Sequence, residues 1–238
     1  MGYAKEELLE MCKREAKRAF TLYQADCINY RGQCSDTGEF YSEVIADYIC
    51  RHIETFKAGI PTINRTSTYR QPTHDGKFNP TSNRAEEIIA MQMFNYCKAG
   101  DSYPWIGKII DYQTPLKAKR TDTAGKIDLL AYDGETLRFL ELKRPDSEET
   151  MLRCVLEGYT YLRTANLAKL LSDFDLPVGT RVVAGPLVFN QGNQWAELFE
   201  DRPHLKRLMA LLGSEPFAYD EHNMIVEQYD VSGQERGI

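Results

Sequence analysis

Two charged side chains lie close together near the end of a segment whose pattern predicts a β-strand. In TLRFLELK (136–143), Glu141 and Lys143 are separated by one residue. Side chains alternate between the two faces of a strand, so both should project to the same side. A carboxylate beside an ammonium group suits either a cross-strand ion pair or a hydrolytic site.

The preceding segment supplies a second carboxylate. KIDLLAY (126–132) also predicts a strand, and Asp133-Gly134 between the two is typical of a tight hairpin turn. A tight turn fixes the register, and the resulting pairing would place Asp128 beside Glu141. Two carboxylates and a backbone carbonyl form a hard oxygen site suited to Mg²⁺ or Mn²⁺. A nearby lysine can orient the attacking water, while the metal stabilises the charge that develops on phosphate.

The chain around this hairpin predicts an α/β fold, with a central mixed sheet flanked by helices. Its core, residues 83–190, should have the order helix, three strands, helix, strand (83–98, 105–115, 126–132, 136–143, 147–165, 180–189). Asp146 and Glu149 are the expected cap of the second core helix. We expect a single domain over 1–238. An N-terminal helical part should cover residues 1–60, with helices at 4–24 and about 38–56, and a loop should follow at 60–82. An extension should cover residues 191–238, with helices at 194–200 and 203–212 and a strand-like segment at 223–231.

The hairpin sequence resembles the signature of the PD-(D/E)XK nuclease superfamily. The resemblance lies in Gly125-Lys126-Ile127-Asp128, twelve intervening residues, then Glu141-Leu142-Lys143. This superfamily includes restriction endonucleases, Holliday-junction resolvases and RecB-type nuclease domains, and its core has the order αβββαβ. The resemblance covers roughly residues 83–190 and implies a restriction-endonuclease-like fold. It implies that Asp128, Glu141 and the Leu142 carbonyl bind the metal, and that Lys143 is the catalytic lysine.

The superfamily often adds a glutamate from the helix before the first strand. Glu86 and Glu87 in NRAEEIIA are the candidates, and we favour Glu86 as a further catalytic residue and metal ligand. Alternatively, Asn83 as N-cap would place Glu86 at the third helical position, where it would close a capping box. Acidic residues there also suit the helix dipole. One glutamate can cap the helix while the other serves the site.

Glu157 and Tyr161 lie four residues apart in the helix predicted after the hairpin. RecB-type nucleases carry a Gln-x-x-x-Tyr motif at a comparable place, and the glutamate here departs from it. The alternative is an exposed Glu157 that pairs with Arg153 one turn earlier. Some RecB-like exonucleases also hold an iron–sulfur cluster through three late cysteines, and this chain has no cysteine after Cys154.

Basic residues near the hairpin are candidates for phosphate contacts, with a solvated basic turn as the alternative. They are Lys117, Lys119 and Arg120 before the first hairpin strand, and Lys143 with Arg144 at the end of the second. Residues of the long loop are candidates for substrate contact on position alone. They are Tyr69, Arg70, His74 and Lys77.

Composition is that of an ordinary globular protein, with 42% hydrophobic and 27% charged residues. A net charge of −6 argues against a protein that coats nucleic acid non-specifically, but it does not exclude a nuclease. The sequence has no apolar run of membrane-spanning length and no apolar signal core, so we expect a cytoplasmic protein without membrane association. Six scattered cysteines and four distant histidines predict buried reduced thiols and no zinc site.

Together these features predict a metal-dependent nuclease that hydrolyses phosphodiester bonds, with DNA as the favoured substrate and Mg²⁺ or Mn²⁺ as cofactor. The alternative is an inactive protein of the same fold that binds nucleic acid or a protein partner. The sequence leaves open DNA or RNA, endo- or exonucleolytic cleavage, and monomer or homo-oligomer.

Overall fold

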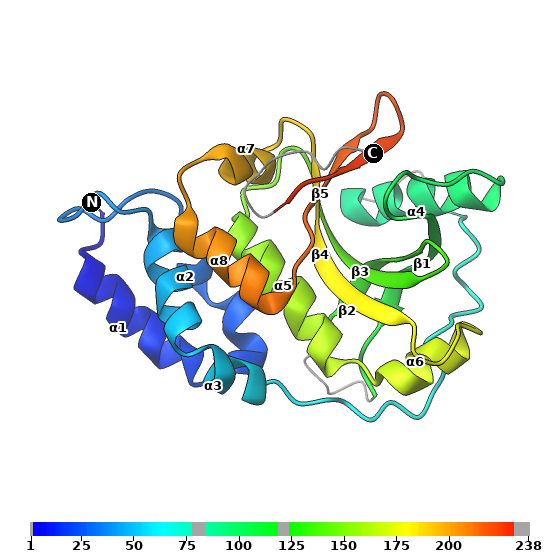
Figure 1. Cartoon of the computed structure of the whole chain (residues 1–238), viewed down its shortest axis with the longest axis horizontal. Helices are drawn as coiled ribbons and strands as arrows, with labels where there is room; N and C mark the ends of the chain where they lie inside the picture. The colour runs from blue at the N-terminus through cyan, green and yellow to red at the C-terminus, as the bar shows by residue number, and fades with distance from the viewer. Residues whose placement is uncertain (1, 78–83, 119–123, 231–238) are drawn as a thin grey trace.

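The computed structural model describes residues 2–77, 84–118 and 124–230 and shows an α/β fold. Six strands form one mixed sheet in the order β1-β2-β3-β4-β5-β6 (Figure 1). They are β1 (Lys108–Pro115), β2 (Lys126–Tyr132), β3 (Thr136–Lys143), β4 (Arg181–Phe189), β5 (Phe217–Asp220) and β6 (Ile225–Gln228). The pairs β3–β4 and β4–β5 are parallel, and the other neighbours are antiparallel.

Helices cover both faces of this sheet. The α-helices are α1 (Lys5–Ala16), α2 (Tyr41–Arg51), α3 (Ile53–Ala58), α4 (Ala85–Lys98), α5 (Met151–Thr164), α6 (Leu167–Asp173), α7 (Asn193–Phe199) and α8 (Pro203–Leu212). Helix α4 packs on β1, whereas α5 packs against β3 and β4 (Figure 1). The N-terminal helices lie beyond α5, where α2 packs against α8. Among the described residues, no helix is both long and apolar enough to cross a membrane.

Alternation along β3 divides the core into two layers. Leu140 and Leu142 belong to the cluster beneath α4, whereas Leu137 and Phe139 belong to the cluster beneath α5. All residues of β3 are buried, so its charged side chains must find partners inside the protein.

The β2–β3 hairpin has the predicted strand bounds and the predicted turn. Its paired residues run from Leu129 opposite Leu140 to the turn. In the turn, Asp133 Oδ1 accepts hydrogen bonds from the amides of Glu135 and Thr136. Gly134 has φ +105°, a conformation that a side chain would strain. Local turn chemistry therefore fixes the register that brings the two strand ends together.

The predicted order of the core elements is confirmed, with α6 added before β4. Two N-terminal boundaries differ from the prediction. The helix expected over 4–24 ends at Ala16 and is followed by 3₁₀ helices at Ala19–Gln24 and Asp26–Asn29. The helix expected over 38–56 begins at Tyr41 and breaks at His52, whose imidazole bonds to the Tyr48 carbonyl. A side chain that takes a helix carbonyl competes with continuation of the helix.

The helix predicted over 147–165 begins at Met151, because its N-cap is Thr150 and not Asp146. The Thr150 hydroxyl accepts the Arg153 amide hydrogen, as an N-cap side chain does. Glu149 therefore precedes the helix and is not part of a capping box. The short strand β5 was not predicted, because its four residues are too few to show a periodicity. All six cysteines are buried and free, as expected.

Candidate functional site

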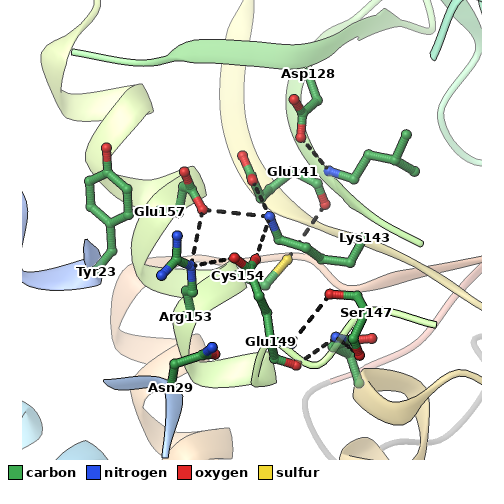
Figure 2. A network of polar contacts seen from close by, with 12 residues as sticks. Tyr23, Asn29, Asp128, Glu141, Lys143, Ser147, Glu149, Arg153, Cys154 and Glu157 are labelled. Carbon is green, nitrogen blue, oxygen red and sulfur yellow. Dashed lines mark hydrogen bonds and ion pairs between the residues drawn. The ribbon is translucent and has the colours of Figure 1, made fainter. Parts of the chain in front are cut away.

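Asp128 lies where the hairpin strands cease to pair. Its Oδ2 accepts the Leu142 amide hydrogen at 3.0 Å (Figure 2). Its Oδ1 accepts a hydrogen bond from Gln113 Nε2 at 2.8 Å. A side-chain carboxylate thus stands where a strand carbonyl would otherwise accept this amide. Because N–H and C=O of one strand residue face the same edge, the Leu142 carbonyl also faces β2. Asp128, Glu141 and this carbonyl therefore meet at one end of the hairpin, as the spacing predicted.

Lys143 and Glu141 are buried together on the face covered by α5. Glu141 is 4% exposed and Lys143 is 5% exposed. Lys143 Nζ lies 2.7 Å from Glu141 Oε1, 2.8 Å from Glu149 Oε2 and 3.6 Å from Glu157 Oε2 (Figure 2). One ammonium group thus serves three carboxylates, two of which come from the segment around α5.

Arg153 is the second cation of this cluster. Its Nε lies 2.9 Å from Glu149 Oε1 and 3.9 Å from Glu157 Oε2. Glu149 Oε2 and Glu157 Oε2 are buried without a partner in hydrogen-bond geometry. Both oxygen atoms lie within ion-pair distance of a cation, but neither accepts a hydrogen bond with good geometry. Arg153 Nε is likewise buried without such a partner, so ion pairing and not aligned hydrogen bonding holds these atoms together.

The alternative of an exposed Glu157 is wrong, because α5 packs this helix face onto the sheet. Glu157 is buried, and its Oε1 accepts a hydrogen bond from Tyr161 at 2.7 Å. The Tyr161 hydroxyl also lies against Gly125, where an added Cβ would come within 2.0 Å of that oxygen. Glycine at the start of the motif therefore makes room for the tyrosine that holds Glu157.

The cluster carries more negative than positive charge. Its carboxylates are Asp128, Glu141, Glu149 and Glu157, and its cations are Lys143 and Arg153. With every group ionised, four negative charges face two positive charges, an excess of two. Burial raises the pKa of Asp128 to about 6, although Lys143 and the Leu142 amide act against it. Burial, and next the charge of Asp128, raise the pKa of Glu141 well above its ordinary value.

Lys143 responds in the opposite sense. Burial lowers its pKa, but Glu141 and the surrounding anions outweigh burial, so that the pKa of Lys143 lies above its ordinary value. The side chain therefore stays protonated at neutral pH. It can donate hydrogen bonds and supply positive charge, but it cannot accept a proton.

A cleft of about 790 Å³ opens above Asp128. Its wall includes charged residues of both signs and two uncharged polar residues, from the start of α4, β1, the hairpin and the segment after β3. They are Arg84, Glu86, Glu87, Gln113, Lys126, Arg144, Asp146, Ser147, Glu148 and Glu149. The polar wall of the cleft suits a charged ligand.

Both candidate glutamates of α4 line this cleft. Glu86 is near enough that its charge contributes to the raised pKa of Asp128. Glu87 forms an ion pair with Arg84 at 3.2 Å. Arg84 is the N-cap of α4, so Glu87 and not Glu86 occupies the third helical position, and the capping alternative for Glu86 is wrong in this register. Asn83, its expected partner, lies outside the described residues.

Other candidates lie away from the site. Tyr69 is fully buried, and its hydroxyl accepts the Asn166 amide hydrogen, so its role is structural. His74 Nδ1 is 2.7 Å from Asp111 Oδ1. Arg70 and Lys77 form exposed ion pairs with Asp175 and Asp75. Of the basic strip, Lys117 is exposed, Arg144 lines the cleft, Lys143 is buried, and Lys119 and Arg120 fall outside the described residues.

The residues present fit a divalent cation. Within the described residues no group of three or more His, Cys, Asp or Glu side chains is arranged to hold a metal ion. Mg²⁺, however, is commonly held by one or two carboxylates and keeps several of its waters. Asp128 and Glu141 are such a pair, and the two excess negative charges equal the charge of one such ion. Burial is the first cause of the raised pKa of both carboxyl groups, and a bound cation would lower both pKa values.

Comparison of the chain with protein-family models, with curated proteins and with solved structures finds no match.

Two members of the cluster were not predicted as site residues. Glu149 had been assigned to a helix cap, and Arg153 only to a surface ion pair. A signal for both was present, because Glu149, Arg153 and Glu157 recur every four residues, as on one helix face. Gln113 carried no such signal. It reaches Asp128 only because β1 pairs with β2.

Proposed function

We propose that this chain is a metal-dependent nuclease of the PD-(D/E)XK kind that hydrolyses phosphodiester bonds, with DNA as the favoured substrate. The main observation behind this proposal is the excess of carboxylate charge around Asp128 and Glu141, beside a protonated Lys143 and next to a cleft that Asp128 and Glu149 line. Buried like charges without full compensation cost stability, and such arrangements are typical of functional sites. The order α4-β1-β2-β3-α5-β4 supports a restriction-endonuclease-like core.

The proposal gives each residue a role that follows from its surroundings. Asp128, Glu141 and the Leu142 carbonyl would hold Mg²⁺ or Mn²⁺, and Glu86 would complete the acidic wall. The bound ion would supply positive charge to the phosphate and lower the pKa of a bound water. Lys143, held protonated by its anionic neighbours, would donate a hydrogen bond to the attacking water or to a phosphate oxygen. Arg153 and Glu149 would fix the position of the lysine.

The cleft walls suit a phosphate backbone despite the net negative charge of the protein. Lys126 and Arg144 line the cleft beside Asp128 and can contact phosphates on either side of the scissile bond. Binding would then depend on a few local cations, and salt would weaken it accordingly.

The direct test is cleavage of supercoiled plasmid and linear DNA with Mg²⁺, Mn²⁺ or EDTA. We expect cleavage with either ion and none in EDTA. Asp128→Asn should remove cleavage, whereas Glu135→Gln, on the exposed turn of the same hairpin, should not. Calorimetric titration with Mn²⁺ should show binding to the wild type and loss of binding in Asp128→Asn. Strong cleavage in EDTA, or full activity of Asp128→Asn, would refute the proposal.

A further inference from the structure

A second groove meets the catalytic cleft at Glu148. It has a volume of about 420 Å³ and is lined by Tyr3, Asn29, Tyr30, Arg31, Tyr41 and Glu148, and Glu148 also lines the cleft above Asp128. The two depressions therefore adjoin each other at this residue. A chain that leaves the catalytic cleft past Glu148 would enter the second groove.

Three tyrosine rings form the wall of this groove. Tyr3 stacks on Tyr30 with ring centroids 5.2 Å apart and planes 11° from parallel. Tyr41 meets both rings edge-on, at 6.1 Å and 6.5 Å. Tyr3 is 39% exposed, although an aromatic ring of this size usually gains by full burial. The outermost ring of a stacked pair is thus offered to solvent inside a groove.

The exposed ring is held in place by backbone contacts on both sides. The Tyr3 amide donates to the Tyr41 hydroxyl at 2.9 Å, and the Tyr3 carbonyl accepts the Ser35 amide hydrogen at 3.0 Å. A ring fixed in this way loses little conformational entropy when a ligand stacks on it.

Arg31 ties this groove to the catalytic segment. Its Nε and Nη2 donate to the carbonyls of Glu148 and Glu149 at 2.8 Å and 2.6 Å. Glu149 in turn contacts Lys143, so the tyrosine cluster and the catalytic lysine are joined through one short rigid segment. The Arg31 side chain remains 36% exposed and also forms an ion pair with Glu197 at 3.8 Å.

From these contacts we propose that the groove binds unpaired nucleotides of a single-stranded DNA segment, with a base stacked on Tyr3. The inference rests on the proposed nuclease function and specifies its substrate as DNA with a single-stranded part. Base stacking on aromatic rings tolerates any sequence, because every base has a flat π face. Paired bases in a duplex are stacked on each other and cannot offer that face to Tyr3.

The test measures binding of fluorescein-labelled oligo-dT and of a blunt duplex in EDTA, by fluorescence anisotropy. Tyr3→Ala should weaken single-strand binding roughly 5-fold to 100-fold, the range for loss of one stacked base, and leave duplex binding unchanged. Tyr3→Phe and Tyr3→Trp keep a flat ring and should restore binding. Because stacking and not ion pairing is lost, the dependence of log Kd on log salt should keep its slope.

A matched control removes an aromatic ring from another groove. Tyr48 stacks on His52 at 4.3 Å and lines a cleft that shares no residue with the catalytic one, so Tyr48→Ala should leave DNA binding unchanged. Equal single-strand affinity of wild type and Tyr3→Ala would overturn the inference, even if the protein cleaves DNA. If the wild type cleaves nothing, the nuclease proposal fails, while selective loss of single-strand binding in Tyr3→Ala would still support the groove.

Discussion

Strand β3 carries an ionic cluster at each end, and the two clusters differ in charge balance. At its beginning, Arg138 contacts Asp133 at 2.6 Å and Glu215 at 3.7 Å, and Arg181 contacts Glu215 at 2.7 Å. Two cations thus face two carboxylates. At its end, two cations face the four carboxylates around Lys143.

The pKa values of two aspartates in the same hairpin differ accordingly. Burial raises the pKa of Asp133, but the Thr136 and Glu135 amides and Arg138 outweigh burial, so its pKa is lowered. The pKa of Asp128 is raised to about 6. A carboxylate with a lowered pKa stabilises the fold, whereas one with a raised pKa is held at a cost. We infer that the balanced end serves the structure; under the proposed function, the unbalanced end holds the metal ion.

The largest expected effect comes from Asp128→Asn. We expect cleavage to fall by about 10³-fold or more, because loss of a metal ligand removes several kcal/mol of transition-state stabilisation. In EDTA the variant should be as stable as the wild type or more stable, since a repelling charge is gone. Single-turnover cleavage with Mn²⁺ and thermal melts in EDTA measure both quantities.

The same change at the balanced end is the matched control. Asp133→Asn should lower stability by about 1–2 kcal/mol, because it breaks a partly buried ion pair, and should leave cleavage intact. The distinction between the two ends would be wrong if Asp128→Asn is much less stable than the wild type in EDTA and Mn²⁺ stabilises the wild type and Asp128→Asn equally. Asp128 would then be a structural residue like Asp133.

The pH dependence of stability should also differ between Asp128 and Asp133. Asp128 has a pKa of about 6 in the fold and near 3.8 when unfolded, so the native state binds more protons between these values. The metal-free protein should therefore lose stability from this group as the pH rises from about 4 to about 6, by about 3 kcal/mol. Asp133, with its lowered pKa, contributes in the opposite sense below pH 4. Urea unfolding of wild type and Asp128→Asn across pH 4–7 measures the loss of this contribution together with the lower pKa of Glu141 that follows when the Asp128 charge is removed.

Gly125→Ala tests the packing behind the unbalanced cluster. The added methyl group would displace Tyr161 and weaken its bond to Glu157, which should cost about 1–3 kcal/mol of stability and reduce cleavage. Gly134→Ala at the turn is the control, because its Cβ meets no atom within 4 Å and acts only through φ +105°. It should lower stability without reducing the activity of folded protein. Equal activity of the folded Gly125→Ala and Gly134→Ala variants would show that the position of Tyr161 does not affect cleavage.

The smallest expected effect separates the two glutamates of α4. Glu86→Gln should reduce cleavage roughly tenfold, the effect of about 1.4 kcal/mol, because it removes a charge that Asp128 senses. Glu87→Gln should change the melting temperature slightly through its ion pair with Arg84 and leave the rate nearly unchanged. Cleavage rates at saturating Mn²⁺ and melting temperatures of the same variants distinguish a role in cleavage from a role in stability. A larger loss of rate in Glu87→Gln would mean that Glu87, and not Glu86, acts at the site.

The local sequence determined the hairpin and the placement of its charged residues. Alternation of apolar residues, Asp133-Gly134 in the turn and Pro145 after β3 act over a few residues, so the bounds of β2 and β3 and the meeting of Asp128 with Glu141 were predictable. The order of the core elements followed for the same reason. Helix starts were less predictable because several nearby residues can cap, and Thr150 caps α5 where Asp146 was expected.

Only the tertiary structure decided which charges are compensated. Glu157 could have been exposed, and it is buried because α5 packs against β3 and β4. Arg31 donates to the Glu148 carbonyl across 117 sequence positions, and Tyr30, its neighbour in the chain, stacks on Tyr3. Burial and long-range contacts set the electrostatics, since a charge acts through the dielectric and the neighbours that the whole fold places around it. The sequence by itself therefore determined which groups could form a site, and packing determined that they share an uncompensated charge at an open cleft.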